Sequence, residues 1–266
     1  KFLYRLKSVR VSFRPEMKKY LNLVREFALT DFKLKYHGSI LGYLWSLLNP
    51  LLIFGTLYLV FSIFIRFEVE NYHLYLLLGI IIWNYFSEAT LNSMNALINK
   101  SPIIKKIYFP RTIIVLASNI TTFIGLILNL VVFSIFMLIT RVKPTLLILI
   151  FPLILIELIL LTLGSSFLLS SLNLRFLDIQ HIWRVFLQIG FWLTPIIYPI
   201  ALIPEKYHNF FLLNPLAIII GDARNIIMYD NVPKLLNMLI SSLFSIIIFL
   251  IGYFIYKKLS TKFAEW

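Results

Sequence analysis

Long apolar runs dominate this sequence and leave few folds open to it. A run of about 20 apolar residues crosses the core of a bilayer as a helix, because a helix satisfies its own backbone hydrogen bonds there. Runs of this length lie at 41–65, 74–97, 112–140, 144–171, 181–198 and 235–256. Hydrophobic residues make up 60% of the 266 residues, more than a soluble domain of this size can cover with polar groups. The sequence therefore predicts an all-α integral membrane protein with six transmembrane helices in a single domain, 1–266.

The N-terminal segment differs from these runs because its apolar residues cover only one side of a helix. Leu21, Val24 and Ala28 recur at steps of three and four, while lysines and arginines fall largely on the other faces. Pro15 suits the first turn of a helix. We therefore predict an amphipathic interfacial helix at 15–36, which lies on the membrane surface and does not cross it.

The segment between the fifth and sixth runs is apolar but interrupted by Pro199, Pro204, Pro215 and Pro233. A water-exposed loop of this length should be polar. Broken apolar helices are tolerated at membrane depth only where protein or a water-filled cavity surrounds them. We predict a re-entrant helix pair at 199–229, with two interfacial helices lying flat as the alternative.

Basic residues set the predicted orientation. They are frequent in 1–40, in 98–111 and near the C-terminus, and sparse in the loops of the opposite side. Basic loops stay in the cytoplasm, so we expect both termini to be cytoplasmic. The formal net charge of +13 then reflects orientation signals beside the spans, and we expect no nucleic-acid partner. The chain begins at Lys1 rather than Met, so we expect its natural start to lie upstream.

A polar stripe runs along the second predicted span. Asn84, Glu88, Asn92 and Asn95 follow one another at steps of three and four, which places them on one face of a helix. Polar side chains within a membrane usually face a bundle interior or a water-filled cavity. The stripe is thus a candidate channel lining; hydrogen bonding between helices is the alternative. Glu157 stands alone in an apolar span, where it could be protonated, paired with another helix or part of a proton path.

Two further patterns occur on the first predicted span. Phe54, Tyr58 and Phe61 form an aromatic stripe that could stack on sugar rings and line the channel, although a core or lipid-facing stripe is the commoner explanation of such a pattern. Before this stripe, small or polar residues recur at steps of four and three and would share one helix face: Gly38, Gly42, Ser46 and Asn49. Small residues at that spacing let helices approach closely, so we expect them to serve helix packing.

Several kinds of site are absent from the sequence. It contains no G-x-x-x-x-G-K-[ST] motif to hold nucleotide phosphates, and no G-x-S-x-G or H-E-x-x-H motif. It has no cysteine, and its four histidines are scattered, so we expect no metal site. We therefore expect a protein that is not an enzyme and binds no cofactor itself.

Four segments carry distinctive motifs: DFKLKYHGSILGYLWSLLNPLL (31–52), KSPIIKKIYFPR (100–111), NLRFLDIQHIWRVFLQIGFWLTPIIYP (173–199) and LNPLAIIIGDAR (213–224). They resemble signatures of ABC-2-type permeases that export polysaccharides, and O-antigen permeases are the nearest members. The segments are distributed over residues 31–224 in the family's order. One departure is Leu177, which stands where a second basic residue is frequent in relatives.

This resemblance implies a homodimer in the bacterial inner membrane, bound to two copies of an ATPase subunit that carries ATP and magnesium. The dimer would export a lipid-linked polysaccharide, and the loop 98–111 would be the cytoplasmic coupling segment that docks on the ATPase. The implied contact residues are Lys100, Pro102, Ile103, Lys105, Lys106, Phe109, Pro110 and Arg111. The segment 199–229 would form the outer gate, with Pro195, Tyr198, Pro199, Asn214, Pro215 and Arg224 as candidates.

Other interpretations remain open from the residues alone. The cations of loop 98–111 could be orientation signals and nothing more. The chain could be an ion-coupled secondary transporter that uses Glu88 or Glu157, although we find no internal repeat of the kind such transporters show. It could also be a membrane enzyme acting on lipid-linked sugars, for which Glu68 and Glu70 are the only paired acids at a membrane face.

Overall fold

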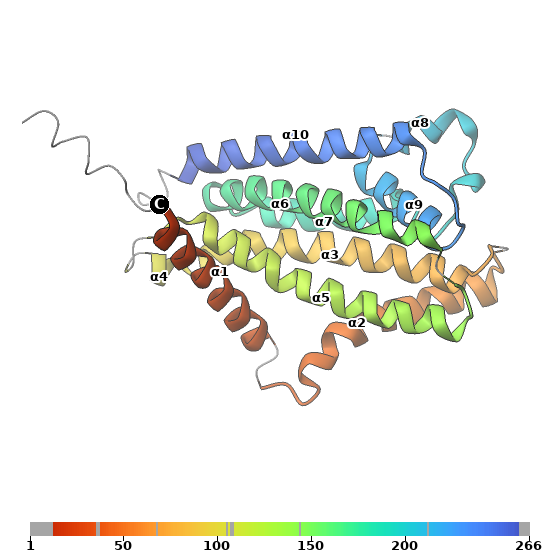
Figure 1. Cartoon of the computed structure of the whole chain (residues 1–266), viewed down its shortest axis with the longest axis horizontal. Helices are drawn as coiled ribbons and strands as arrows, with labels where there is room; N and C mark the ends of the chain where they lie inside the picture. Colours follow the sequence, from red (N-terminus) through yellow and green to blue (C-terminus); the bar gives the residue numbers. More distant parts are fainter. Residues whose placement is uncertain are drawn as a thin grey trace, which may run out of the picture.

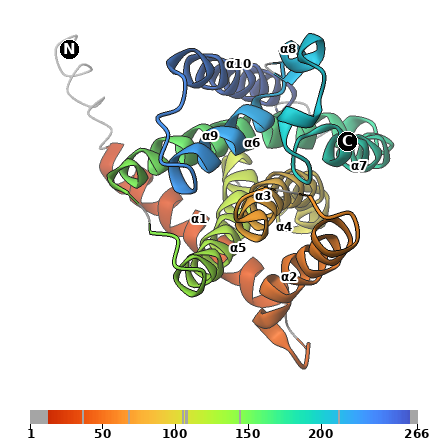
Figure 2. The ribbon, with the colours of Figure 1, turned by 90° about the vertical axis from the view of Figure 1, so that its right-hand side faces the viewer.

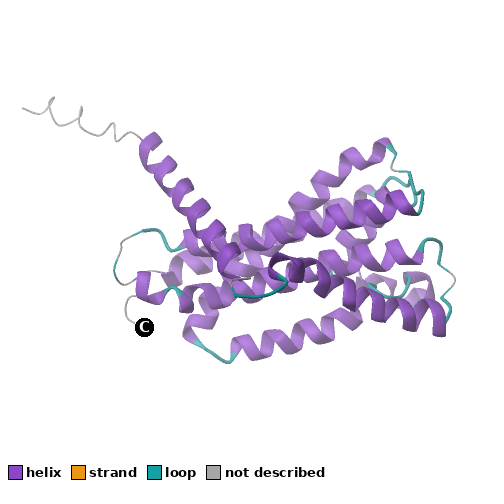
Figure 3. Cartoon of the chain, turned by 90° about the horizontal axis from the view of Figure 1, so that it is seen from below, coloured by secondary structure: helices purple, strands orange, loops and turns teal. Residues whose placement is uncertain are grey.

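The computed structural model describes residues 13–260, except 36–37, 68, 105, 107–108, 144 and 212, and the regular elements of this part are all helices (Figure 3). The α-helices are α1 (Phe13–Lys35), α2 (Trp45–Tyr58), α3 (Tyr72–Asn99), α4 (Ser101–Ile104), α5 (Thr112–Ile139), α6 (Phe151–Arg175), α7 (Ile179–Leu193), α8 (His208–Phe211), α9 (Pro215–Ile227) and α10 (Leu235–Ser260). A π-helical turn, Leu59–Phe64, extends α2, and a 3-10 turn, Leu146–Ile150, leads into α6.

Five of these helical segments are long and apolar enough to cross a membrane. They are Trp45–Phe64, Tyr72–Asn99, Thr112–Ile139, Leu146–Arg175 and Leu235–Ser260. They correspond to the first, second, third, fourth and sixth predicted spans. The chain is therefore a multi-pass membrane protein, as its apolar runs predict.

The helix of the fifth predicted span, 181–198, is shorter than expected. α7 has 15 residues and ends at Leu193, so it is roughly 22 Å long, less than the ~30 Å core of a bilayer. Its end follows from Pro195, because a proline disfavours the helical conformation in the residue before it. Thr194 accordingly adopts an extended conformation, with φ −85° and ψ 137°. The chain continues as a buried turn instead of as helix.

Helix α3 lies at the centre of the bundle. It packs against α2, α5, α6, α7 and α9, and the end-on view shows it enclosed by its neighbours (Figure 2). In the most apolar 18-residue stretch of α3, 78% is buried, against 11–28% in the corresponding stretches of the other four spans. A helix that is apolar apart from one polar stripe is suited to such a position. The side chains of α3 therefore form much of the interior of the bundle.

Helix α1 leaves the bundle obliquely, beginning at the end where α4 and the last turn of α10 also lie (Figure 1). Its residues Val24 and Ala28 are buried against α5, and Thr121 of α5 donates a hydrogen bond of 3.0 Å to the Ala28 carbonyl. The predicted apolar face is thus a packing face of the bundle. Its interfacial position in a membrane stays a prediction.

The two glycines between α1 and α2 serve a turn and not a helix contact, which corrects the packing prediction. Gly38 and Gly42 have φ values of +80° and +50°, and a side chain at either would meet open space. Left-handed backbone is readily available only to glycine, which explains the residue type. A step of four outside a helix places nothing on a common face.

The segment 199–229 contains one substantial helix in its described part. Pro199 and Pro204 break its first half into single turns, while α9 has 13 residues and is buried among α3, α6 and α10. Asn214 caps α9, its side-chain oxygen accepting from the backbone N–H of Leu216 at 3.1 Å. The predicted pair is therefore a single buried helix preceded by short turns.

Candidate functional site

A polar cavity of about 460 Å³ lies beside α3, between the C-terminal end of α1, α2 and α5. The predicted stripe supplies Asn84 and Glu88, and α2 supplies Ser46 and Asn49. The remaining lining residues are Lys35, Trp45, Pro50, Ile81, Tyr85, Ser87, Leu91, Thr122, Gly125, Leu126 and Asn129. A concave site with a few convergent polar groups is typical of a binding or transport site.

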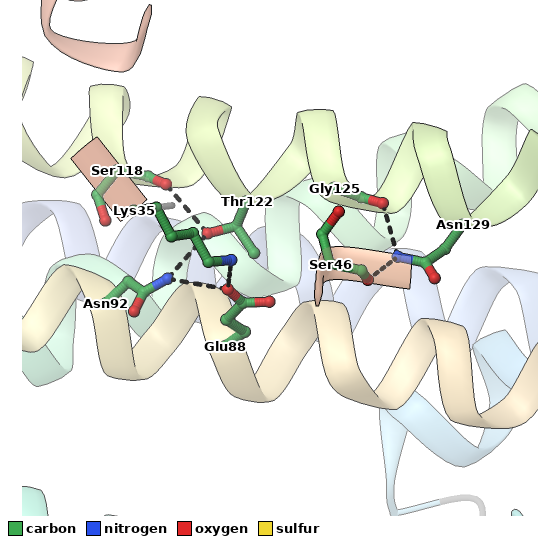
Figure 4. Close-up of polar contacts among 8 residues, drawn as sticks. All are labelled: Lys35, Ser46, Glu88, Asn92, Ser118, Thr122, Gly125 and Asn129. Carbon is green, nitrogen blue, oxygen red and sulfur yellow. Dashed lines mark hydrogen bonds and ion pairs between the residues drawn. The ribbon is translucent and has the colours of Figure 1, made fainter. Parts of the chain in front are cut away.

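An ion pair links α1 to the middle of α3 within this cavity. Lys35 Nζ bonds to Glu88 Oε1, and Asn92 Nδ2 donates to the same carboxylate at 3.4 Å (Figure 4). Asn92 also reaches the Thr122 hydroxyl at 3.4 Å. Glu88 thus has a cation and an amide as partners. Lys35 is missed by sequence reasoning because it lies 53 residues away on another helix.

A second polar contact closes the far side of the same cavity. Asn129 Nδ2 donates to the Gly125 carbonyl at 2.8 Å and to the Ser46 carbonyl at 3.3 Å, which ties α5 to the start of α2 (Figure 4). The polar residues therefore combine the two roles that the sequence left open, because they line a cavity and also form hydrogen bonds between helices. Asn95 is half-buried further along α3 and does not line the cavity.

The aromatic stripe of α2 lies outside the cavity. Phe54 is buried, stacked on Tyr58 with ring centroids 5.7 Å apart and edge-on to Phe136 at 5.8 Å. Phe61 packs against Phe67 at 5.5 Å. These rings fill the space between helices within one chain, which favours the core-stripe interpretation over sugar stacking.

Arg224 holds the end of the molecule where α7 stops. It is buried, and its guanidinium donates to the carbonyls of Tyr75 at 2.9 Å, Pro195 at 2.7 Å and Ile196 at 2.8 Å. It also stacks on the Tyr75 ring, 3.4 Å from the centroid. Gly79 makes room for it, because a Cβ there would lie 2.6 Å from Arg224 Nη2.

The other predicted gate residues gather around the same turn. Tyr75 donates its hydroxyl to the Tyr198 carbonyl at 2.9 Å, and Asn214 donates to the Thr194 hydroxyl at 3.0 Å. Pro215 is the first residue of α9, and Pro199 is half-buried beyond Tyr198. The structure therefore brings Pro195, Asn214 and Arg224 together through the turn that ends α7, a packed junction whose gating role stays a prediction.

In the loop between α3 and α5, several of the residues expected to contact an ATPase partner are bonded to or packed against other parts of the chain. Lys100 forms an ion pair with Asp31 of α1 and lies over the Phe27 ring, 4.8 Å from its centroid. Phe109 is buried against the same ring, 5.7 Å between centroids. Arg111 donates to the Ser260 carbonyl at the end of α10.

The exposed described positions of this loop are Pro102, Ile103, Lys106 and Pro110. Lys105 lies outside the described residues. The buried Phe109 cannot serve as an anchor for a partner without leaving α1, so Ile103, 39% exposed, is the large apolar candidate among the described residues of the loop.

Glu157 has partners on a neighbouring helix. It is buried in α6, and its two oxygens accept hydrogen bonds from Ser241, at 2.7 Å, and from Ser242, both on α10. Of the possibilities left open by the sequence, this geometry favours pairing between helices.

Comparison with known proteins agrees with this arrangement. Residues 23–228 match the family described as ABC-2 type transporter. An O-antigen export system permease protein RfbA of Klebsiella pneumoniae is 34% identical over 237 residues, 88% of this chain and 91% of that protein. A permease of the same name from Myxococcus xanthus is 24% identical over 252 residues, 94% of this chain and 97% of that protein. The chain belongs to the ABC-2 type transporter family.

Proposed function

We propose that this chain is the membrane subunit of an ABC exporter that moves a lipid-linked polysaccharide of the O-antigen kind from the cytoplasm across the bacterial inner membrane. The observation that carries the proposal is the match to O-antigen export permeases over 88% of the chain. The polar cavity on the central helix supports it, because a hydrophilic polymer needs polar surface within the membrane.

Energy would come from a separate protein. The sequence has no phosphate-binding motif, so ATP and magnesium would bind to two copies of a partner ATPase. The basic loop 98–111 would face the cytoplasm with both termini, and docking would use Pro102, Ile103, Lys106 and Pro110, which are exposed in its described part. Since Lys100 and Phe109 bind α1, movement of the loop would be passed to α1 as well as to α3 and α5.

Two copies of the chain would form the transport path between them. The ion-coupled alternative gains no support from the structure, because Glu88 is paired with Lys35 and Glu157 with two serines. Both carboxylates are already bonded to other residues of the protein, so neither is free to carry an ion.

Export in cells tests the proposal directly. The gene is deleted in its host, and surface polysaccharide is measured by gel and antibody with and without a plasmid copy. After deletion we expect the polysaccharide to disappear from the surface and to accumulate inside the cell. With the plasmid it should return to the surface, but only when the partner ATPase keeps its phosphate-binding lysine. Unchanged surface polymer after deletion, or full export with the inactive ATPase, would overturn it.

A further inference from the structure

A second groove lies on the opposite side of the polar stripe, between α3 and α7. Its volume is about 280 Å³, and it shares Asn84, Ser87 and Leu91 with the polar cavity. The α7 side contributes Arg184, Gln188 and Trp192. Polar surface thus continues around α3 from the cavity into this groove.

The α7 residues form a line of their own. Arg184, Gln188 and Trp192 follow one another at steps of four, so they lie along one face of α7, and all three are exposed. A cation, an amide and an aromatic ring therefore succeed one another along the groove. Leu187 is buried, and Trp183 donates to the Thr90 hydroxyl at 2.9 Å, which fixes α7 against α3.

Arg184 has no acidic partner among the described residues. The two ion pairs of the described residues do not include it, and none of their hydrogen bonds uses its guanidinium. Across the groove, the hydroxyl of Ser87 is buried with no hydrogen-bond partner in the same part of the chain. An exposed guanidinium without a protein partner near the end of a membrane helix is free to bind an anionic group.

The position of Arg184 along the helix suits one kind of ligand. It lies five residues after the start of α7, roughly 7 Å along the axis, at the end that the proposed orientation places toward the cytoplasm. In that orientation the phosphate groups of the cytoplasmic leaflet would lie on the same side of the membrane as this end of α7. A guanidinium binds phosphate oxygens with two parallel hydrogen bonds, and an aromatic ring further along can cover a sugar face.

We propose that the groove formed by Arg184, Gln188, Trp192 and Ser87 binds the phosphate or diphosphate group that joins a lipid carrier to its saccharide. This inference rests on the proposed function, since it names a contact for that substrate. Arg184 holds the anionic group, Gln188 donates a further hydrogen bond, and Trp192 lies beside the first sugars. The polymer then reaches the stripe of α3 through Asn84.

Binding to the isolated permease tests this site. The full chain is placed in phosphatidylcholine nanodiscs and titrated with farnesyl diphosphate, with farnesol as the probe that lacks phosphate. We expect the diphosphate to bind and farnesol to bind more weakly. Arg184→Gln should weaken diphosphate binding about tenfold or more, because it removes a charged two-point contact. Arg184→Lys should lie between the two, since lysine keeps the charge without the planar fork.

Lys234→Gln is the matched control, because it removes one positive charge from an exposed position at the start of α10. It should bind like the wild type. Equal affinities for wild type and Arg184→Gln would overturn the site, as would equal binding of farnesol. If Arg184→Gln does not assemble, wild-type affinity in both Arg184→Lys and Gln188→Ala would overturn it instead.

A competing lipid gives the last arm of the test. If phosphatidylglycerol in the nanodisc displaces the diphosphate at equal concentration, the groove is a general anionic-lipid site and the proposal is wrong. This experiment needs neither the ATPase nor export. Its failure is therefore distinct from failure of the proposed function, which the deletion strain reports separately.

Discussion

Arg224 shows how a cation can be buried here without a carboxylate. No ion pair of the described residues contains it, and backbone carbonyls take the place of an acid. Two of these carbonyls, those of Pro195 and Ile196, lie in the turn that follows the end of α7 at Leu193, and the third, that of Tyr75, belongs to α3. The C-terminal end of a helix also carries partial negative charge, which favours a cation there.

Arg224→Lys should lower the stability of the protein. Lysine keeps the charge but cannot reach three carbonyls in one plane or stack as a guanidinium does on Tyr75. We expect a loss of about 1–3 kcal/mol, the typical cost of unpaired buried polar groups. Thermal denaturation in detergent, followed by size-exclusion chromatography, measures it. Lys234→Gln serves as the control, and an unchanged midpoint for Arg224→Lys would contradict this role.

Glu88→Gln should leave the fold intact and preserve much of the export. The side chains of Lys35 and Glu88 are 33% and 41% exposed, and ion pairs this accessible contribute about 0–1 kcal/mol. If ATP supplies the work, loss of the carboxylate should slow export only a few-fold, at every pH from about 6 to 8. The amount of surface polysaccharide, measured over that pH range, tests this prediction. Abolished export by a correctly assembled variant would speak for an ion-coupled mechanism instead.

At the scale of elements, the closest approach lies between α6 and α10. A Cβ at Gly252 would lie 2.0 Å from the Gly164 carbonyl oxygen, and one at Gly164 would lie 2.5 Å from the Phe249 backbone. Glycines at both positions let the two backbones touch, as small residues do in membrane bundles. The contact brings Ser241 within reach of Glu157 on the same pair of helices.

Gly252→Ala should push α10 away from α6 and weaken the bundle. The added methyl group meets backbone, which cannot turn aside, so we expect a clear fall in the thermal midpoint. Gly221→Ala is the matched control, because that glycine lies within α9 and a Cβ there meets nothing within 4 Å. The control should be neutral or slightly stabilising, since alanine favours a helix by about 1 kcal/mol over glycine. Equal midpoints for both variants would refute the close contact.

Elements were predictable where one helix face or one apolar run decides the outcome. The spans at α2, α3, α5, α6 and α10 follow from length and hydropathy alone. The end of α7 was misplaced, although Pro195 carried the signal, because the apolar run continues past it. Gly38 and Gly42 were misread because the step of four was assumed to be helical.

At the scale of the whole molecule, the polar sites depend on contacts that no local pattern reveals. Lys35 meets Glu88 across 53 residues, and Arg224 meets Tyr75 across 149. The residue spacing on α3 predicts the polar stripe, but it does not predict the partners of the stripe on α1 and α5. The spacing of Arg184, Gln188 and Trp192 on α7 is also visible in the sequence, but no local pattern shows that they face α3.

Orientation can be tested with introduced cysteines, because the chain contains none of its own. Lys106→Cys should resist a membrane-impermeant maleimide in intact cells and react after permeabilisation, since its loop would be cytoplasmic. Lys206→Cys, at the opposite end of the molecule, should react in intact cells; both positions are exposed. The reverse pattern would invert the proposed topology and the direction of export with it.

The most direct test of the account is whether the chain works with a separate ATPase. The tagged chain is co-expressed with its neighbouring genes, purified in mild detergent and assayed for ATP hydrolysis. We predict that a phosphate-binding-loop ATPase co-purifies in equal amount, and that Lys105→Glu with Lys106→Glu reduces its association or its coupling to export. The charge-matched control, Lys206→Glu with Lys234→Glu at exposed positions outside this loop, should not. Purification of the chain alone, still able to transport, would contradict the account.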